Sequence, residues 1–225
     1  MIWPNLIVDN FFTDPDKIVE ISKRYTYKND GGSPGVRTPP LHQVDHAFFS
    51  WSTKKILAFL YPHEVPNLRW AASATFHKIP TNLPNPQLGG WVHKDSPSEF
   101  TAILYLSKDG IGTSLFEPVS PEIVMAKEQK MKYNYFENPD LSAREVAKIA
   151  KAKEKNNSGF REILSVDGKY NRLFLFDAAH YHGVHVSKNS DLKSTRLTYI
   201  IFFNKITLDN SALALKYPGT ESRRI

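Results

Sequence analysis

A series of short strand-like segments, which begins near residue 69, limits the folds open to this chain more than any other feature. The segments are rich in β-branched and aromatic residues, which suit strands, and turn residues separate them. They are Trp70–Phe76, Phe100–Leu106, Ser114–Phe116, Glu162–Val166, Asn171–Phe176 and Leu197–Phe203. Many short strands favour a β-sandwich or barrel over a doubly wound parallel sheet, and the sequence has no glycine-rich phosphate loop.

Two of these segments have the spacing of a β-hairpin. Asp167-Gly168 follows Glu162–Val166 and precedes Asn171–Phe176. Because Asp-Gly is typical of tight hairpin turns, we expect these two strands to pair with each other.

Helical patterns precede and interrupt the strand series. Thr13-Asp14-Pro15 supplies a cap and an early proline for an amphipathic helix that ends near Tyr25. Apolar residues at helical spacing predict a second helix over Ser50–Tyr61, within a helical N-terminal part of about residues 1–66. Pro121–Lys155 predicts a helical insert, about residues 119–160, in one domain that spans residues 1–225. Because an insert between strands emerges at a rim, we expect this one to vary without disturbing functional residues on either side of it in sequence. As a lid it would contact substrate, and at the same spacing its apolar residues could equally pack onto the sheet; these residues are Met125, Met131, Tyr133, Tyr135 and Phe136.

The absence of cysteine excludes a disulfide scaffold, a zinc ribbon, an iron–sulfur centre and a thiol nucleophile. Any metal must therefore use histidine and carboxylate ligands. The formal net charge of +6 is compatible with acidic partners, nucleic acid included, and identifies none of them. No apolar run approaches the ~20 residues that cross a bilayer, and the N-terminus lacks a secretory pattern. We expect a soluble, cytoplasmic protein without a membrane partner.

The pair His93 and Asp95 is the first candidate for metal binding. In an extended segment these two side chains lie on one face, where both could ligate one ion. The alternative is a surface histidine and a turn aspartate before Pro97.

A third ligand is available after the buried run Leu173–Phe176, where His180, His182 and His185 follow. Two histidines and one carboxylate form the facial triad of non-heme Fe(II) oxygenases. Arg196 then opens the last apolar strand, and a buried guanidinium pairs well with a carboxylate. Its alternative role is a salt bridge at the rim.

A rival cluster consists of His42, Asp45 and His46, whose spacing would place them on one helical face. It lacks a glutamate base between the histidines. A core-facing or substrate-facing role is the preferred interpretation.

The order of these motifs resembles the 2-oxoglutarate and Fe(II)-dependent dioxygenases, in particular the prolyl-4-hydroxylase-like branch of small bacterial and phage members. The motifs are His93-x-Asp95, His182-x-Val184 and Arg196-x-Thr198. Tyr105-Leu106-Ser107 stands where that branch carries a strand tyrosine that contacts 2-oxoglutarate, and Arg172–Phe176 resembles the strand before the distal histidine. The resemblance covers most of the chain and is strongest over Trp91–Phe203.

This resemblance implies three ligands for Fe(II), which are His93, Asp95 and His182. It implies three residues for 2-oxoglutarate: Arg196 for the distal carboxylate, with Tyr105 and Thr198 as hydrogen-bonding partners. His182 is preferred to His180 because it matches the His-x-Val of the family, whereas the interval from His182 to Arg196 is longer than usual.

The implied fold is a double-stranded β-helix, or jelly roll, which is mainly β with N-terminal helices on one sheet and the helical insert. The implied activity is hydroxylation coupled to decarboxylation of 2-oxoglutarate to succinate, with ascorbate as an accessory reductant. The substrate is a protein side chain, peptidyl proline first, or a small molecule. The alternatives are a non-catalytic jelly-roll binding module and a nucleic-acid-directed oxygenase. Nucleic-acid demethylases of this superfamily usually carry a second arginine six positions after the first, where this chain has Phe202.

Overall fold

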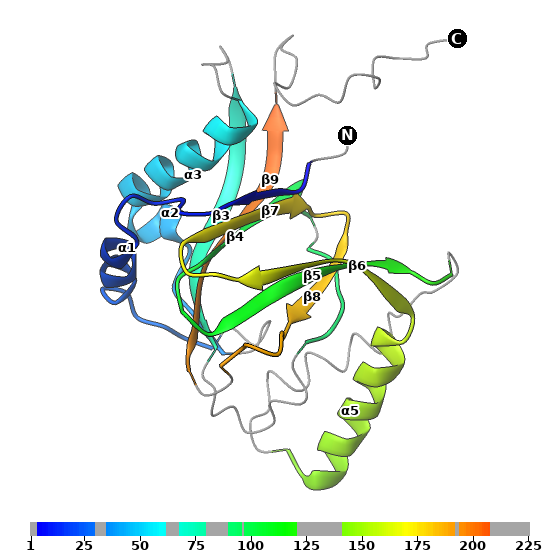
Figure 1. The fold of residues 1–225 in the computed structure, drawn as a ribbon. Coiled ribbons are helices and arrows are strands. Elements are labelled where there is room, and N and C mark those ends of the chain that lie inside the picture. Colours follow the sequence, from blue (N-terminus) through cyan, green and yellow to red (C-terminus); the bar gives the residue numbers. More distant parts are fainter. Residues whose placement is uncertain are drawn as a thin grey trace, which may run out of the picture.

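Two antiparallel β-sheets and four helices make up the described part of the chain in a computed structural model (Figure 1). The structure describes residues 4–29, 35–61, 68–79, 90–95, 97–120, 141–191 and 194–207. The helices are α1 (Pro15–Ser22), α2 (Leu41–Val44), α3 (His46–Leu60) and α5 (Ala143–Asn157). The strands are β1 (Leu6–Val8), β2 (Val36–Arg37), β3 (Arg69–Ile79), β4 (Phe100–Tyr105), β5 (Gly110–Pro118), β6 (Phe160–Gly168), β7 (Arg172–Asp177), β8 (Tyr181–His185) and β9 (Arg196–Thr207).

The larger sheet has six strands in the order β1-β7-β4-β9-β3-β2, and the smaller sheet has three in the order β6-β5-β8. Neighbouring strands are antiparallel throughout both sheets. An apolar core joins the sheets, with Ile103 and Phe176 from the larger sheet and Leu115 and Val166 from the smaller one. This architecture confirms the predicted mainly β jelly roll.

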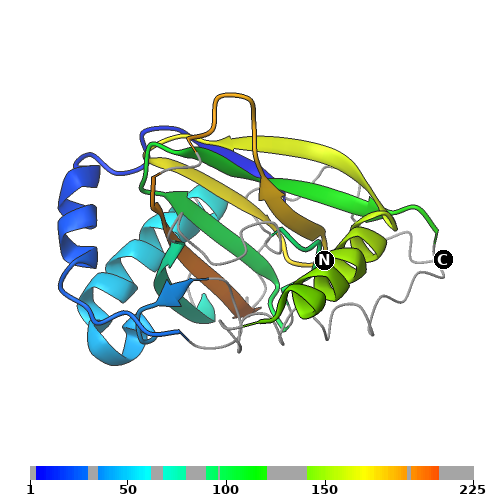
Figure 2. The ribbon, with the colours of Figure 1, turned by 90° about the horizontal axis from the view of Figure 1, so that it is seen from below.

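The central strands of the larger sheet, β7, β4 and the first half of β9, are buried on both faces. On β4, Phe100, Ala102 and Leu104 belong to the core beneath the helices, while Ile103 and Tyr105 belong to the core between the sheets. Helices α1, α2 and α3 cover the outer face of this sheet, and α5 lies on the other side of the molecule (Figures 1 and 2). Burial of both faces explains why these strands read as nearly continuous apolar runs.

Two aspartates determine where the N-terminal helices begin. Asp14 accepts a hydrogen bond from the Lys17 N–H (3.0 Å), and α1 starts directly after it, as predicted. Helix α1 ends at Ser22, earlier than expected. Helix α3 starts before the predicted residue 50, because Asp45 caps it by accepting a hydrogen bond from the Phe48 N–H (2.9 Å).

The predicted hairpin of β6 with β7 is wrong. Strand β6 pairs with β5 in the smaller sheet, whereas β7 pairs with β1 and β4 in the larger sheet. The turn between them therefore carries the chain from one sheet to the other. Gly168 is required for a different reason: a Cβ there would lie 2.1 Å from the Ile111 carbonyl oxygen of the paired strand.

Helix α5 lies within the predicted insert. Ser142 caps it in a capping box with Glu145. The residues expected to form a lid lie outside the described part of the chain: Met125, Met131, Tyr133, Tyr135 and Phe136.

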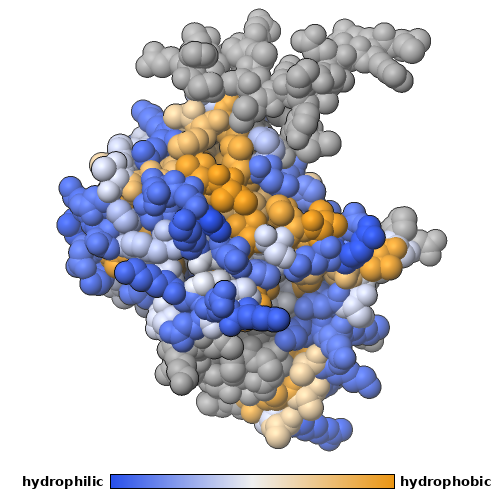
Figure 3. Space-filling model, viewed as in Figure 1, coloured by the Kyte–Doolittle hydropathy of each residue, from blue (hydrophilic) through white to orange (hydrophobic). Residues whose placement is uncertain are grey.

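Apolar side chains gather on the surface over β1 and the adjoining part of α3 (Figure 3). Trp51 and Phe59 of α3 are exposed, and their rings contact those of Phe12 and Phe11, respectively. None of the helices in the described ranges is both long enough and apolar enough to cross a membrane.

Asn171 ties the N-terminal segment to the larger sheet. Its side chain accepts a hydrogen bond from the Phe12 N–H (2.9 Å) and donates one to the Phe12 carbonyl (2.8 Å). Its backbone N–H donates to the Tyr105 carbonyl, and its φ of 62° lies in the left-handed region that asparagine tolerates. Asn171 therefore connects the N-terminal segment, β4 and the start of β7.

We expect Asn171→Ala to lower the free energy of unfolding by about 2 to 4 kcal/mol, because two buried backbone groups of Phe12 would lose their partners. Urea denaturation followed by tryptophan fluorescence measures this loss. Asn171→Asp keeps the acceptor and the backbone preference, so it should lose less. A change within about 0.5 kcal/mol for Asn171→Ala, as for an ordinary surface substitution, would contradict this role.

Candidate metal centre

A bridge between two backbone segments brings the candidate histidines together. The His93 N–H donates to the His182 carbonyl (2.9 Å), and the His182 N–H donates to the His93 carbonyl (2.8 Å). His182 lies on β8, so the segment 90–95 extends the smaller sheet beyond that strand. The two imidazole rings stand 4.4 Å apart between centroids as a result.

Asp95 completes a compact group with these histidines. Its carboxylate oxygens lie 3.9 Å from His93 Nε2 and 3.3 Å from His182 Nε2. One potential ligand atom from each of the three residues lies within 4.8 Å of the other two. In the described part of the chain, this is the one group of histidine and acidic residues with such a spacing.

Hydrogen bonds orient each member of this group. His93 Nδ1 donates to the Trp91 carbonyl (2.8 Å), and His182 Nδ1 lies 3.4 Å from the His180 carbonyl. Because a carbonyl only accepts, these contacts place the Nδ1 protons and direct the Nε2 lone pairs toward Asp95. Thr101 on β4 donates to the Asp95 carboxylate (2.9 Å).

The donor set suits a divalent cation. Two imidazole Nε2 atoms and one carboxylate converge, with partners behind the histidines that hold the rings in place. This is the ligand combination of the facial triad. The site lies between the sheets, since Phe176 of β7 packs on the His182 ring at 4.9 Å between centroids.

The other two histidines of the motif lie elsewhere. His180 belongs to the turn before β8, where its N–H donates to the Asp177 carbonyl. His185 lies 3.2 Å from Ser114 Oγ through Nδ1 and 3.2 Å from the Asp167 carboxylate through Nε2.

The rival cluster does not form one helical face. Helix α2 ends at Val44 and α3 begins at His46, so His42 and His46 belong to different helices. The Asp45 carboxylate caps α3 and accepts a hydrogen bond from the Tyr25 hydroxyl (2.8 Å).

The three residues predicted to bind 2-oxoglutarate lie together on the inner face of the larger sheet. Tyr105 and Thr198 are direct cross-strand neighbours, and Arg196 lies two positions before Thr198 on β9. The Arg196 guanidinium carbon is 5.8 Å from the centre of the Tyr105 ring. All three are buried.

No carboxylate of the described residues forms an ion pair with the buried Arg196, although the negative charge of Asp109 acts to raise its pKa. Its Nη2 donates to the Gly112 carbonyl (3.2 Å), and its Nε is buried without a hydrogen-bond partner in the described part of the chain. Burial lowers the pKa of Arg196, but a guanidinium remains charged at any physiological pH. An anion bound beside Tyr105 would satisfy this charge.

Polar residues between the two groups escaped the sequence-based prediction. Thr101 donates a hydrogen bond to Asp95, and Thr113 accepts one from the Tyr105 hydroxyl (2.9 Å). Thr75 Oγ1 is buried without a hydrogen-bond partner in the described residues. Thr75 lies opposite Ile200, one pair along the inner face from Thr198. Because side chains alternate between the two faces of a strand, the sequence of β4 could have placed Thr101 on the same face as Tyr105. No local sequence pattern indicates that Thr75 lies near the site.

The insert contacts the segment that carries His93. Asn157, at the end of α5, accepts a hydrogen bond from the Val92 N–H and donates one to the Gly90 carbonyl, both at 3.0 Å. Asn156 donates to the Val92 carbonyl (3.0 Å), and Ile149 packs on Trp91. The end of α5 therefore contacts the backbone directly before His93, a contact that the sequence-based analysis did not foresee.

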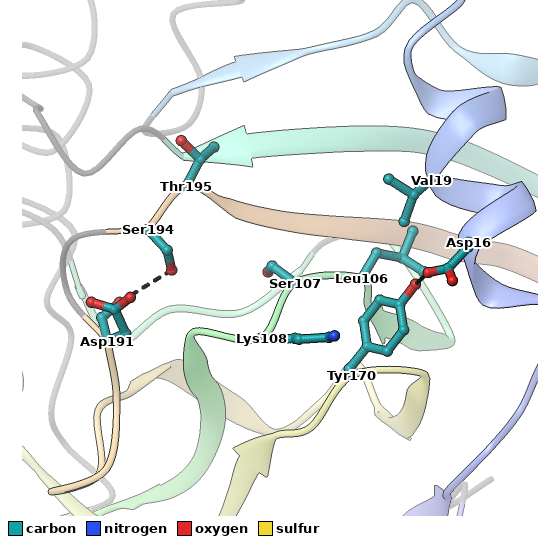
Figure 4. Close-up of a pocket in the computed structure, with 9 residues that line it drawn as sticks. All are labelled: Asp16, Val19, Leu106, Ser107, Lys108, Tyr170, Asp191, Ser194 and Thr195. Carbon is teal, nitrogen blue, oxygen red and sulfur yellow. Dashed lines mark hydrogen bonds between the residues drawn. The ribbon is translucent and has the colours of Figure 1, made fainter.

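A pocket of about 390 Å³ is separate from this centre (Figure 4). It lies between α1 and the ends of several strands, and its lining residues are Asp16, Val19, Leu106, Ser107, Lys108, Tyr170, Asp191, Ser194 and Thr195. The Tyr170 hydroxyl donates to Asp16, and the Lys108 amine lies 5.5 Å from the centre of the Tyr170 ring. None of the candidate metal or 2-oxoglutarate ligands lines it.

The fold is similar to that of HygX from Streptomyces hygroscopicus. The complex of HygX with nickel, 2-oxoglutarate and hygromycin B gives a TM-score of 0.52 at 12% identity, over 88% of this chain and 82% of that one. The complex with nickel and 2-oxoglutarate gives 0.51 at 11% identity, with the same coverage. A prolyl-4-hydroxylase from Pseudomonas putida gives 0.46 at 12% identity, over 88% of this chain and 91% of that one.

At these identities the likeness establishes the fold alone, a jelly roll that this chain shares with HygX. No curated protein matches the sequence. A family model does match, over residues 3–203, and its description is a family of unknown function, DUF6445. Because this match spans most of the sequence, the chain belongs to the DUF6445 family.

Proposed function

We propose that this protein is an Fe(II)- and 2-oxoglutarate-dependent dioxygenase that hydroxylates a protein side chain or a small molecule. The observation that carries this proposal is the convergence of His93, Asp95 and His182 between the two sheets. The buried Arg196 supplies the second requirement, a cation without a carboxylate partner among the described residues.

Each group of residues has a distinct task in this proposal. His93, Asp95 and His182 hold the metal, and Thr101 keeps the Asp95 carboxylate oriented. Arg196, Tyr105 and Thr198 bind the distal carboxylate of 2-oxoglutarate. Bound iron and 2-oxoglutarate would supply the electrons that activate dioxygen, and dioxygen would be the oxidant in the hydroxylation. The apolar core between the sheets limits access of water to the site.

The substrate proposal rests on the inner face of the larger sheet. Phe202 lies opposite Thr101, and therefore beside the residue that orients Asp95. This aromatic side chain favours an uncharged substrate group near the metal. It also occupies the position where a nucleic-acid demethylase usually carries its second arginine, which argues against a nucleic-acid substrate. A protein side chain remains the first candidate from the sequence motifs, and the hygromycin B complex of HygX supports a small molecule as the second.

Loss of any proposed metal ligand should abolish the metal complex. With Fe(II) and 2-oxoglutarate under anaerobic conditions, the wild-type protein should show a weak visible metal-to-ligand charge-transfer band. His93→Ala, Asp95→Ala and His182→Ala should each remove this band, because two protein ligands hold iron poorly. His180→Ala is the matched control and should retain it. A band that survives His182→Ala and disappears in His180→Ala would identify His180 as the distal ligand.

Loss of Arg196 should weaken 2-oxoglutarate binding and spare the metal. We expect Arg196→Ala to cost about 3 to 5 kcal/mol of 2-oxoglutarate affinity, because one member of a buried ion pair is removed. Tyr105→Phe should cost about 1.5 to 3 kcal/mol, the value of a hydrogen bond to a charged group. Calorimetric titration with 2-oxoglutarate in the presence of Ni(II) measures both effects.

Arg172→Ala is the matched control for Arg196→Ala. Arg172 lies opposite Tyr105 on the neighbouring strand, but its guanidinium pairs with Asp9 (Nε to Oδ1, 2.6 Å). Its removal should leave 2-oxoglutarate affinity unchanged. Equal and negligible effects of Arg196→Ala and Tyr105→Phe would place the cosubstrate elsewhere.

Slow formation of succinate from 2-oxoglutarate with Fe(II), without an added substrate, should distinguish the dioxygenase from a binding module. Mass spectrometry of succinate measures this uncoupled turnover, and His93→Ala provides the background rate. A protein that binds neither Fe(II) nor 2-oxoglutarate would be a non-catalytic jelly roll.

A further inference from the structure

The segment that carries His93 is held along both of its edges. Along a strand, the N–H and C=O groups of successive residues point in opposite directions. The His93 groups accordingly meet β8 at His182, and the Val92 groups meet the last turn of α5. Residues 90–93 therefore lie between a true strand and a helix end.

The Asn157 side chain forms the pair of backbone hydrogen bonds that a neighbouring strand would form with this segment. Its side-chain amide has one acceptor and one donor, as a peptide group has, and these bind the Val92 N–H and the Gly90 carbonyl. Asn156 adds a bond to the Val92 carbonyl and is fully buried. Two adjacent asparagines of the insert thus form hydrogen bonds with the edge of residues 90–92 that faces away from β8.

This contact is one residue away from a candidate metal ligand. Trp91 lies between the two residues that Asn157 binds, and its carbonyl accepts the proton of His93 Nδ1 (2.8 Å). The Trp91 side chain is buried against Ile149 of α5. A shift of residues 90–92 would therefore move the carbonyl that orients the His93 ring.

We propose that Asn157 and Asn156 are positioning residues of the metal centre, so that the last turn of α5 sets the affinity for the metal. This inference rests on the proposed function, because it presumes that His93, Asp95 and His182 bind a metal ion. Partners behind metal ligands typically change metal affinity about 10- to 100-fold when they are removed. The insert is then a part of the active site as well as a connection between β5 and β6.

The test compares Asn157→Ala with the wild-type protein in two measurements. The first is the dissociation constant for Co(II) alone, together with the d–d absorption bands of the Co(II) complex, which report the arrangement of the ligands. The second is hydrogen exchange of the metal-free protein over residues 90–95, with the amides of β4 and β9 as internal references. Alanine is a better helix former than asparagine, so a loss of affinity cannot come from a weakened α5.

Three further variants sharpen the comparison. Lys151→Ala changes an exposed residue of the same helix and should behave as the wild type does. Asn157→Asp keeps the acceptor for the Val92 N–H and loses the donor to the Gly90 carbonyl, so it should keep part of the protection from exchange. Asn156→Ala removes the buried contact, and thermal denaturation shows whether it remains folded.

We expect Asn157→Ala to weaken Co(II) binding at least about tenfold, to change the d–d bands and to speed exchange at residues 90–95 only. Unchanged Co(II) affinity in Asn157→Ala would overturn the inference, whatever the exchange rates, and would leave the proposed function intact. A wild-type protein that binds neither Co(II) nor Ni(II) would overturn the metal centre itself, and the inference with it.

Discussion

The backbone bridge between His93 and His182 is the interaction on which the rest of the site depends. Paired strands lie about 4.7 to 4.9 Å apart, so side chains on the same face of directly paired residues must meet. The two imidazole rings accordingly stand 4.4 Å apart between centroids, and Asp95 reaches both from two positions along the same segment. Because His93 and His182 lie on either side of the insert in sequence, this pairing is what makes them neighbours.

A polar strip connects this group with Arg196 across an otherwise apolar interior. Thr101, Thr75 and Thr198 occupy successive pairs on the inner face of the larger sheet, and Arg196 follows them. A buried guanidinium is costly unless an anion accompanies it, and Tyr105 and Gly112 are the described groups that contact it. The same alternation that buries apolar residues under the helices therefore places these polar side chains and Arg196 on the opposite face, where the proposed 2-oxoglutarate carboxylate would bind.

The insert provides hydrogen-bond partners for the backbone next to His93. An exposed edge next to the metal-bearing segment would leave backbone groups of residues 90–92 without partners. The asparagines at the end of α5 satisfy these groups, as a strand would, from a helix that the chain forms between β5 and β6. A ligand on a supported segment keeps its orientation better than one on a free loop.

The sequence by itself determined the mainly β class, the N-terminal helices and the residue types available for a metal and for 2-oxoglutarate. Periodicity and capping are local properties, so they can be read directly from Asp14 or from the strand Phe100–Leu106. Only the tertiary structure decided that β6 and β7 belong to different sheets, that His182 rather than His180 lies beside Asp95, and that Thr75 and Asn157 belong to the surroundings of the site. These features depend on register and packing between segments far apart in the chain, and a shift of one residue in register would turn every side chain of a strand to the other face.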